Sequence, residues 1–561
     1  MIYKFYGPPG TGKTYRLISR ARAYARKGVP LDKIGYFAFT KKAAEEAKSR
    51  MPFDKKKLPY FQTLHSFGFK TLKLHESKIL QPEHYQIFGK KIGLRVQYKD
   101  KYNDEEVCYL KHDNPYLQLI NKAENKGITP ISEYNTGRYD PKTIKGKRMV
   151  NYIYNNLNKY KNAKKLYDFN DMIKLLIDSP DIPNFEVIFI DEAQDLSPMQ
   201  WRLFDVLKTK AKDIYLAGDD DQAIYAWAGA DVKRFIDEPA KERVLKFSKR
   251  IAKNIQIQSK IPVNRIRGAK KHKEYLPRNY EGKVAYISNL NQIDLNKDKW
   301  LILTRIKDTA FDIMKELKNK NIYYQYKGNK SYHLKLYNKI KTYLNWCNGE
   351  KVGETEWKDV LKISGREEIT EKKDWYTLFT KAPQKEKSYI LNLLNKGEDL
   401  DKDARIKIST IHSIKGGEED NVILSLHQGS KIQRSIKNNI EKQDEEHRVW
   451  YVGITRARNN LYEFKCCIKH IFTCHILYSV SLFLVLSLYR LFLALVIPTY
   501  QTRCSSSCFS ILFFMDRCIF DPWCRDNITL SSSPPFIECI VEIFILASLS
   551  RSSPLFNKFK I

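Results

Sequence analysis

The stretch GPPGTGKT, at residues 7–14, has the form G-x-x-x-x-G-K-[ST] of a phosphate-binding loop. In such a loop the glycines let backbone N–H groups close around phosphates, Lys13 reaches the outer phosphates, and the Thr14 hydroxyl binds Mg²⁺. The apolar residues 2–6 predict a short strand before the loop, and residues 13–28 predict a helix after it, whose N-terminus favours an anion. The alternative is a glycine turn that binds nothing, which the complete order of strand, loop and helix disfavours.

The charge balance narrows the class of partner. The 561 residues include 98 Lys and Arg against 64 Asp and Glu, a formal net charge of +34. This surplus favours a polyanionic partner, most simply nucleic acid, because basic side chains release the counterions of phosphates. A lysine-rich surface without such a partner remains the alternative.

Short apolar runs alternate with helical stretches along the chain, which is the pattern of parallel α/β layers. The clearest strands fall within residues 33–39, 185–195, 213–222, 299–305 and 421–426. Ligand groups in such sheets collect at the carboxyl ends of the strands, and several polar motifs of this chain follow these runs directly. The sequence therefore predicts an α/β fold with its functional groups at one sheet edge.

Two adjacent acids, Asp191 and Glu192, follow the apolar run of residues 185–190. One carboxylate can hold Mg²⁺, directly or through water, and the other can polarise an attacking water, so the pair suits nucleoside triphosphate hydrolysis. A lone acidic pair after a strand is usually a solvated loop. The complete phosphate-binding loop upstream favours the catalytic interpretation.

The order of the motifs resembles a known family, the superfamily 1 DNA helicases of the UvrD/Rep/PcrA type. The resemblance covers residues 1 to about 465 and rests on GPPGTGKT, FAFTKKAAEEAKSRM, FQTLHSF, YDFNDMI, IFIDEAQDLSPMQ, LAGDDDQAIYAWAGAD, ISTIHSIKGGEEDNVIL and VWYVGITRAR. It implies two RecA-like motor domains of the P-loop NTPase class with mostly helical insertions. The last two motifs, with Lys415, Gly416, Tyr451 and Thr455, favour the branch that moves 3′→5′ on single-stranded DNA.

The resemblance implies a site for ATP and Mg²⁺. Asp191 would be the metal-side acid together with Thr14, Glu192 the general base, and Gln222 the sensor of the γ-phosphate. Arg250 and Arg456 would be arginine fingers, and such groups stabilise transition-state charge only when two domains close. The complete set of nucleotide-contacting residues expected is Gly7, Pro8, Pro9, Gly10, Thr11, Gly12, Lys13, Thr14 and Glu418.

The resemblance also implies contacts with single-stranded and duplex DNA. The expected DNA-contacting residues are Phe39, Thr40, Thr63, His65, Tyr225, Trp227, Thr410 and His412. The aromatic members lie just beyond strand ends, where bases can stack on them without regard to sequence. For any isolated aromatic residue, packing in the core is the alternative.

Three departures from the family pattern concern nucleotide choice and DNA contact. The family usually reads adenine with a glutamine-containing segment upstream of the loop, and here six residues precede it. Lys249 stands where an aromatic residue is usual, and Ala228 stands where a basic residue is common. We therefore expect modest discrimination between ATP and GTP.

The expected domain organisation follows from the motif order. Residues 1–75 and 150–242 would form motor domain 1A, split by insertion 1B at residues 76–149. Residues 243–330 and 403–465 would form motor domain 2A, split by a reduced insertion 2B at residues 331–402. Residues 466–561 match no part of the family.

That tail differs in composition from the rest of the chain. It holds eight of the ten cysteines, at spacings unlike a zinc site, and residues 476–497 form an apolar run with one charge, Arg490, long enough to span a bilayer. We expect the tail to be the translation of a shifted frame or of non-coding DNA. A genuine membrane anchor and a cysteine-rich module are the alternatives, and membrane association is expected only if the tail is genuine.

Before the tail, Cys108 and Cys347 are the only cysteines, and Met1 leads directly into the first expected strand without a secretory leader. Both observations favour a cytoplasmic protein. The predicted function is an ATP-dependent DNA helicase or translocase. The alternatives are a DNA-dependent ATPase that translocates or strips proteins without efficient unwinding, and a non-functional product with an out-of-frame tail.

Overall fold

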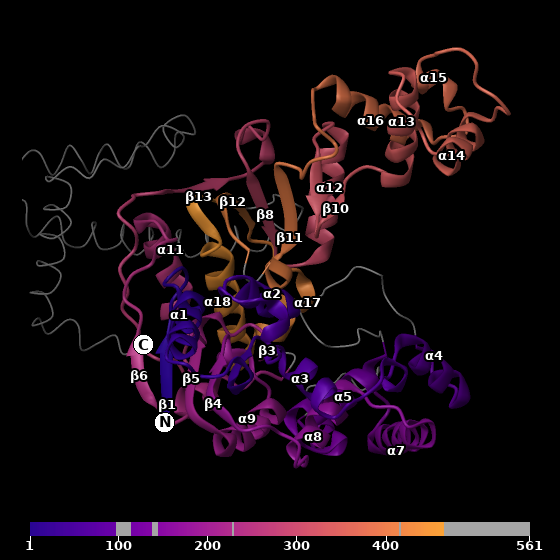
Figure 1. Cartoon of the computed structure of the whole chain (residues 1–561). Coiled ribbons are helices and arrows are strands. Elements are labelled where there is room, and N and C mark those ends of the chain that lie inside the picture. Colours follow the sequence, from indigo (N-terminus) through magenta and orange to yellow (C-terminus); the bar gives the residue numbers. More distant parts are fainter. Residues whose placement is uncertain (97–113, 137–143, 227–228, 415–416, 465–561) are drawn as a thin grey trace, which may run out of the picture. The chain divides into compact units, whose positions relative to one another are not determined.

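The structure, a computed structural model, describes residues 1–96, 114–136, 144–226, 229–414 and 417–464 (Figure 1). All of them belong to one compact unit, Met1–Cys466. The predictions made for Trp227, Ala228, Lys415 and Gly416 lie outside the described residues. So do the predictions for the tail, including its apolar run.

The first sheet has six parallel strands in the order β3-β2-β4-β5-β1-β6. Their bounds are β1 (Ile2–Tyr6), β2 (Ile34–Phe37), β3 (Phe61–Gln62), β4 (Phe185–Ile190), β5 (Ala211–Gly218) and β6 (Lys241–Val244). Because β1 lies between β5 and β6, the loop that follows β1 leaves the sheet beside the end of β5. The carboxyl ends of these parallel strands share one edge.

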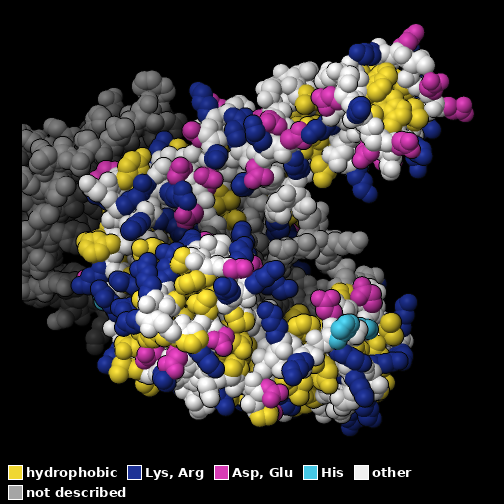
Figure 2. Space-filling model, viewed as in Figure 1, with side chains coloured by type: hydrophobic (Ala, Val, Ile, Leu, Met, Phe, Trp, Pro, Cys, Tyr) yellow, Lys and Arg dark blue, Asp and Glu magenta, His cyan; other side chains and the backbone are white. Residues whose placement is uncertain are grey.

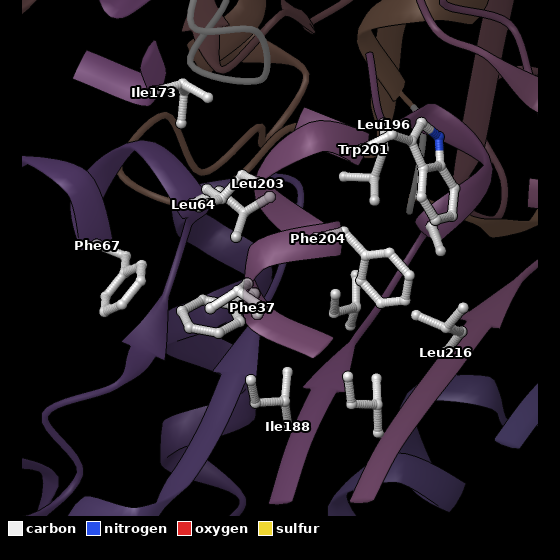
Figure 3. Packing of buried hydrophobic residues seen from close by; sticks show 14 of the residues in the cluster. Phe37, Leu64, Phe67, Ile173, Ile188, Leu196, Trp201, Leu203, Phe204 and Leu216 are labelled. Carbon is white, nitrogen blue, oxygen red and sulfur yellow. The ribbon is translucent and has the colours of Figure 1, made fainter. Parts of the chain in front are cut away.

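Both faces of this sheet are buried, as expected for parallel strands. In β4 the side chains of Ile188 and Ile190 pack in one apolar cluster, and those of Val187 and Phe189 pack in the cluster on the opposite face. Figure 3 shows the first cluster, in which Ile188 and other strand residues face side chains of α3 and α9. The covering helices are α1 (Lys13–Arg26) and α2 (Lys41–Ser49) on one face, and α3 (Leu64–Thr71), α8 (Phe169–Ile177), α9 (Pro198–Lys210) and α10 (Val232–Asp237) on the other.

The second sheet has seven strands in the order β10-β9-β11-β8-β12-β13-β7. All neighbouring strands are parallel except the short β10, which is antiparallel to β9. The strands are β7 (Lys283–Ile287), β8 (Trp300–Thr304), β9 (Tyr324–Tyr326), β10 (Asn329–Lys330), β11 (Ile406–Thr410), β12 (Glu419–Ser425) and β13 (Ala457–Phe464). The helices α11 (Lys253–Asn264), α12 (Lys307–Asn319), α17 (Ser430–Ile436) and α18 (Ile440–Ile454) accompany it.

Two groups of helices interrupt the sheets, and each has an apolar cluster of its own. The first lies between β3 and β4 and contains α4 (Pro82–Lys91), α5 (Pro115–Lys126), α6 (Pro130–Tyr134) and α7 (Lys147–Lys164). The second lies between β10 and β11 and contains α13 (Leu334–Cys347), α14 (Glu354–Ser364), α15 (Trp375–Leu378) and α16 (Gln384–Asn395).

The predicted fold class, two RecA-like α/β parts with parallel sheets and mostly helical insertions, is confirmed. The finer division into 1A, 1B, 2A and 2B stays a prediction. Within the described ranges, no helix has both the length and the apolar character that crossing a membrane requires.

Candidate nucleotide and DNA site

The phosphate-binding loop connects β1 to α1. Gly10 and Gly12 have φ values of 73° and 82°, in the left-handed region that favours glycine, and Gly12 is the N-cap of α1. A Cβ at Gly10 would lie 2.3 Å from Cβ of Arg250, so the close approach of these two segments also requires glycine. The Lys13 ammonium donates to the Gly7 carbonyl at 2.8 Å and thus lies across the loop. The loop geometry therefore suits an anion at the N-terminus of α1.

Asp191 lies directly beyond β4 and faces the start of α1. Its Oδ2 accepts hydrogen bonds from the Thr14 hydroxyl at 2.7 Å and from the Tyr36 hydroxyl at 2.9 Å. Burial, followed by the charge of Glu192, raises the pKa of Asp191 above its ordinary value. A buried carboxylate in this state gains from a cation, and hydroxyl and carboxylate oxygens are the ligands Mg²⁺ prefers. Thr14 and Asp191 therefore fit a Mg²⁺ site.

Glu192 is held in an unusual backbone conformation. Its φ of 54° is in the left-handed region, which is costly for a residue with a side chain and is found most often at functional sites. Gln194 donates to Oε2 of Glu192 at 2.5 Å, and its own Oε1 accepts from the backbone N–H of Asp219 at 3.0 Å. The position of this carboxylate is thus tied to the end of β5.

Arg456 joins the second sheet to the first. It lies between α18 and β13 and is 2% exposed. Its guanidinium donates to Oε1 of Gln222, just beyond β5, at 2.9 Å, and to the carbonyls of Val452 at 3.0 Å and Gly417 at 3.4 Å. Burial, followed by the nearby charge of Arg250, lowers the pKa of Arg456 to about 10. A negatively charged ligand in the cleft would relieve that cost.

Arg250 and Glu418 lie on the second-sheet side of the same cleft. The Arg250 guanidinium forms an ion pair with Glu418, which also accepts from Arg458 at 2.7 Å. The backbone near Arg250 contacts the loop, because Lys249 N–H donates to the Gly10 carbonyl at 2.9 Å and the Ser248 hydroxyl donates to the Pro9 carbonyl at 2.7 Å. Arg250 and Arg456 thus both line the cleft together with the phosphate-binding loop of the first sheet.

These groups enclose a cleft of about 660 Å³. Among the residues predicted from the sequence, the cleft is lined by Pro9, Gly10, Thr11, Gly12, Lys13, Thr14, Phe39, Thr40, Asp191, Glu192, Gln222, Tyr225, Arg250, Glu418 and Arg456. Gly7 and Pro8 belong to the start of the loop, outside this lining. The remaining predicted residues that the structure describes, Thr63, His65, Thr410 and His412, lie elsewhere.

The two predicted DNA-contacting aromatics that the structure describes form a stacked pair. The rings of Phe39 and Tyr225 have centroids 5.1 Å apart at an interplanar angle of 27°. Tyr225 is only 2% exposed, and its hydroxyl donates to the His412 carbonyl at 3.1 Å. In this arrangement the Tyr225 ring is buried between the two sheets. Its stacking on a base stays a prediction.

The other predicted DNA residues cap or flank short elements. Thr63, 2% exposed, caps α3 by accepting from the Ser66 N–H at 3.1 Å, and Thr40 caps α2 in the same way. His65 packs edge-on against Phe169 with ring centroids 5.5 Å apart, and burial lowers its pKa to about 4. The Thr410 hydroxyl pairs with that of Ser413 at 3.0 Å. Helix capping explains threonine at positions 40 and 63 without DNA, and the DNA contacts of all these residues stay predictions.

Sequence reasoning missed Tyr15. This residue directly follows Thr14, lines the cleft and is 64% exposed. The ammonium of Lys249 lies 6.0 Å from its ring centroid, within the range of a cation–π contact. The available signal was an aromatic residue in the first turn of the helix that follows the phosphate-binding loop. Lys249, which stands where the family has an aromatic residue, therefore lies beside the aromatic ring of Tyr15 in the same cleft.

Comparisons with known proteins agree on one family. The sequence pattern of the UvrD/REP helicase N-terminal domain matches residues 4–242, and that of the UvrD-like helicase C-terminal domain matches residues 362–466. A probable DNA helicase of Mycoplasma pneumoniae is 28% identical over 253 residues, 41% of this chain and 46% of that protein.

Two further relatives give similar matches. The ATP-dependent DNA helicase PcrA of Staphylococcus aureus is 26% identical over 242 residues, 40% of this chain and 32% of its own length. The putative ATP-dependent DNA helicase YjcD of Bacillus subtilis is 29% identical over 246 residues, 41% of this chain and 31% of its own length. The matched region thus spans less than half of each of these relatives.

Proposed function

Since the chain belongs to the UvrD-like family of superfamily 1 DNA helicases, we propose that it is an ATP-driven motor that moves 3′→5′ along single-stranded DNA and separates duplex strands. The observation that carries the ATP-driven part of this proposal is the hydrogen bond from Arg456 to Gln222 at 2.9 Å, which links the second sheet to the first. The polarity rests on the likeness of the last two motifs to the 3′→5′ branch. A site completed by both sheets can hydrolyse ATP only in step with their relative movement.

The chemistry follows from the residues of the cleft. The loop and Lys13 would bind the triphosphate, and Thr14 and Asp191 would hold Mg²⁺, which would neutralise phosphate charge during the transfer. Glu192 accepts the proton of the attacking water, and the hydrogen bond from Gln194 fixes the direction of its carboxylate. Gln222, which already bonds Arg456, senses the γ-phosphate.

Coupling to DNA depends on the arginines. Arg456 donates to Gln222, and Arg250 pairs with Glu418. A triphosphate draws both guanidinium groups inward because each is desolvated and gains from a strong anionic partner. The shift moves the second sheet relative to the first, and with it the candidate DNA residues His412 and Thr410.

The distribution of Lys and Arg on the surface supports binding to nucleic acid. Figure 2 shows Lys and Arg side chains gathered where α1 and α2 lie in Figure 1. Exposed members include Arg20, Lys41 and Lys42. Together with the net charge of +34, this supports salt-dependent binding to phosphates.

Nucleotide choice follows from Tyr15 and Lys249. The exposed ring of Tyr15, beside the phosphate-binding loop, offers a stacking surface to any base. The Lys249 ammonium next to it does not distinguish adenine from guanine. We propose that ATP is the working nucleotide and that GTP is a competent substitute.

A second candidate is a DNA-dependent ATPase that translocates or strips proteins without efficient unwinding. It is favoured by the small size of the insertion between β10 and β11, which holds only the four described helices α13 to α16. Strand separation and translocation can be measured separately, so the two candidates are distinguishable.

The test uses duplexes that carry either a 3′ or a 5′ single-stranded tail, together with single strands blocked by streptavidin at one end. The proposal expects ATP-dependent unwinding of the 3′-tailed duplex and displacement of streptavidin from the 5′ end. Glu192→Gln is the matched control, because it keeps the nucleotide site and removes the base. Streptavidin displacement without unwinding would favour the second candidate, and a preference for 5′ tails would contradict the proposed polarity.

A further inference from the structure

A buried lysine of the second-sheet region contacts the run of acids that precedes Gln222. The segment at residues 265–282 connects α11 to β7 and passes over the end of β5. Its Lys273 ammonium lies 3.0 Å from Oδ1 of Asp219 and 2.8 Å from Oδ2 of Asp221, and it also pairs with Asp220. The single positive charge of Lys273 is therefore shared by three consecutive carboxylates.

The contact is almost completely removed from water. The Lys273 side chain is 2% exposed, and Asp219 and Asp220 have no exposed surface. Burial alone lowers the pKa of Lys273, but the three carboxylates together raise it above its ordinary value. Burial raises the pKa of Asp221 to about 6 against the opposing effect of Lys273. Without the ammonium, three buried carboxylates would lie close together with no cation between them, which would displace the run.

Asp219 connects this lysine to both catalytic elements of the first sheet. Its Oδ2 accepts from the side-chain amide of Gln222 at 2.7 Å. Its backbone N–H donates to Gln194 at 3.0 Å, and Gln194 donates to Glu192 at 2.5 Å. Gln222, the proposed γ-phosphate sensor, and Glu192, the proposed base, are thus both linked by hydrogen bonds to Asp219, Glu192 through Gln194. Asp219 in turn pairs with Lys273.

The contact with Asp219 sets which way the Gln222 amide points. The NH₂ group of Gln222 donates to the Asp219 carboxylate, and its carbonyl oxygen is left to accept from Arg456. A displaced Asp219 would allow the amide to turn, and an NH₂ group would then face the guanidinium of Arg456. The ion pair with the buried ammonium of Lys273 holds Asp219 in place.

A second contact from the same side holds the acidic run. Arg448 of α18 donates to the Asp220 carbonyl at 3.0 Å and to the Ala269 carbonyl at 2.9 Å. The backbone N–H of Lys271 donates to Oδ2 of Asp220 at 2.8 Å. The run that ends at Gln222 is therefore held by α18 and the 265–282 segment together.

We propose that Lys273 is a positioning residue that fixes Gln222 and Glu192 through Asp219, so that movement of the second sheet is passed directly to the ATP site. This inference rests on the proposed function. It assigns Lys273 no contact with nucleotide or DNA and predicts that its loss lowers turnover without weakening ATP binding.

The first test compares Lys273→Gln with the matched control Lys271→Gln. Lys271 lies on the same segment, but its ammonium is 40% exposed and pairs with Glu242 at 2.6 Å, away from Asp219. DNA-stimulated ATP turnover and the KM for ATP are measured for both. Lys273→Gln should lower kcat on the order of tenfold with KM within about twofold, whereas Lys271→Gln should leave both within about twofold.

A second variant guards against loss of folding. Lys273→Met combined with Asp221→Asn removes an ammonium and a carboxylate together, so the net charge of the buried cluster is unchanged while Asp219 loses its cation. It should show the same fall in kcat, with a cooperative thermal transition. A folded double variant with wild-type kcat would overturn the proposal.

A double-mutant cycle separates positioning from general destabilisation. If Lys273 acts in part through Gln222, then Lys273→Gln should lower kcat by clearly less than tenfold in a Gln222→Ala background, with the remaining loss passing through Gln194 to Glu192. Full multiplicative effects would overturn the proposed route through Gln222. A wild-type protein without DNA-stimulated ATPase would refute the proposed function itself, whereas an active wild type with an equally active Lys273→Gln would refute this inference alone.

Discussion

Replacing Arg456 by methionine should remove most of the turnover and little of the stability. Methionine keeps an unbranched side chain of adaptable shape but removes the charge and every hydrogen bond. A guanidinium that stabilises phosphoryl transfer accelerates it by about 10³ to 10⁵, so kcat should fall at least ~10³-fold, equivalent to ~4 kcal/mol.

The stability estimate follows from the contacts of Arg456. Its three hydrogen bonds, to Gln222, Val452 and Gly417, contribute about 1 kcal/mol each, or ~3 kcal/mol in total. Burial opposes them, because it lowers the pKa of Arg456 to about 10, and a shift of that size corresponds to ~3 kcal/mol against the charged form. The two effects nearly cancel. The free energy of unfolding without nucleotide should therefore change by less than ~2 kcal/mol.

The assay pairs steady-state phosphate release in the presence of single-stranded DNA with urea unfolding. Arg458→Met is the matched control, since Arg458 lines the same cleft but is 44% exposed and pairs with Glu418 at its rim. An exposed pair contributes at most ~1 kcal/mol, so kcat of this variant should remain within about fivefold of wild type. Equal losses for both variants, or an Arg456→Met kcat within tenfold of wild type, would refute the reasoning.

Four other predictions concern separate parts of the site. Glu192→Gln should bind ATP normally, because the side-chain amide oxygen can still accept from Gln194, but lose turnover by ~10²- to 10⁴-fold; near-normal turnover in phosphate release would reject the base assignment. Tyr15→Ala should weaken ATP and GTP alike by ~1 to 3 kcal/mol in equilibrium titration while Tyr15→Phe does not, and a loss confined to ATP would mean that adenine is read elsewhere. Burial lowers the pKa of His65 from 6.5 to about 4, so the unfolded chain binds a proton at this histidine more readily than the folded protein does. As the pH falls from 7 to 4, the free energy of unfolding of the wild type should therefore decrease by up to ~3 kcal/mol relative to that of His65→Gln. Parallel pH profiles of the two proteins in urea unfolding would contradict this. A chain that ends at Lys465 should keep DNA-stimulated ATPase, and its complete loss would show that the tail is required.

Strands buried on both faces could be predicted from the sequence because their apolar runs are continuous. The expected strands at residues 2–6 and 299–305 correspond to β1 and β8. The missed strands are short or partly polar. The two-residue β3 and the exposed pattern of β6 carry no periodicity, so neighbours in the sheet decide their conformation.

The loop and the acidic pair could be predicted because their chemistry is local in the sequence. Contacts between distant segments could not. Nothing in the sequence distinguishes Lys273 from the many exposed lysines, because its burial depends on three aspartates about fifty residues upstream. The burial of Tyr225 has the same origin, since its ring meets Phe39 and the backbone of His412 only after both sheets have formed.

The central claim is that ATP hydrolysis in this cleft depends on single-stranded DNA. Phosphate release measured with and without an excess of single-stranded oligonucleotide tests it most directly, with Glu192→Gln as the blank. We predict a low rate without DNA, a saturable increase of at least tenfold with single-stranded DNA, and no increase in Glu192→Gln. A wild-type protein that binds the oligonucleotide but hydrolyses ATP at the same rate with and without it would contradict the claim.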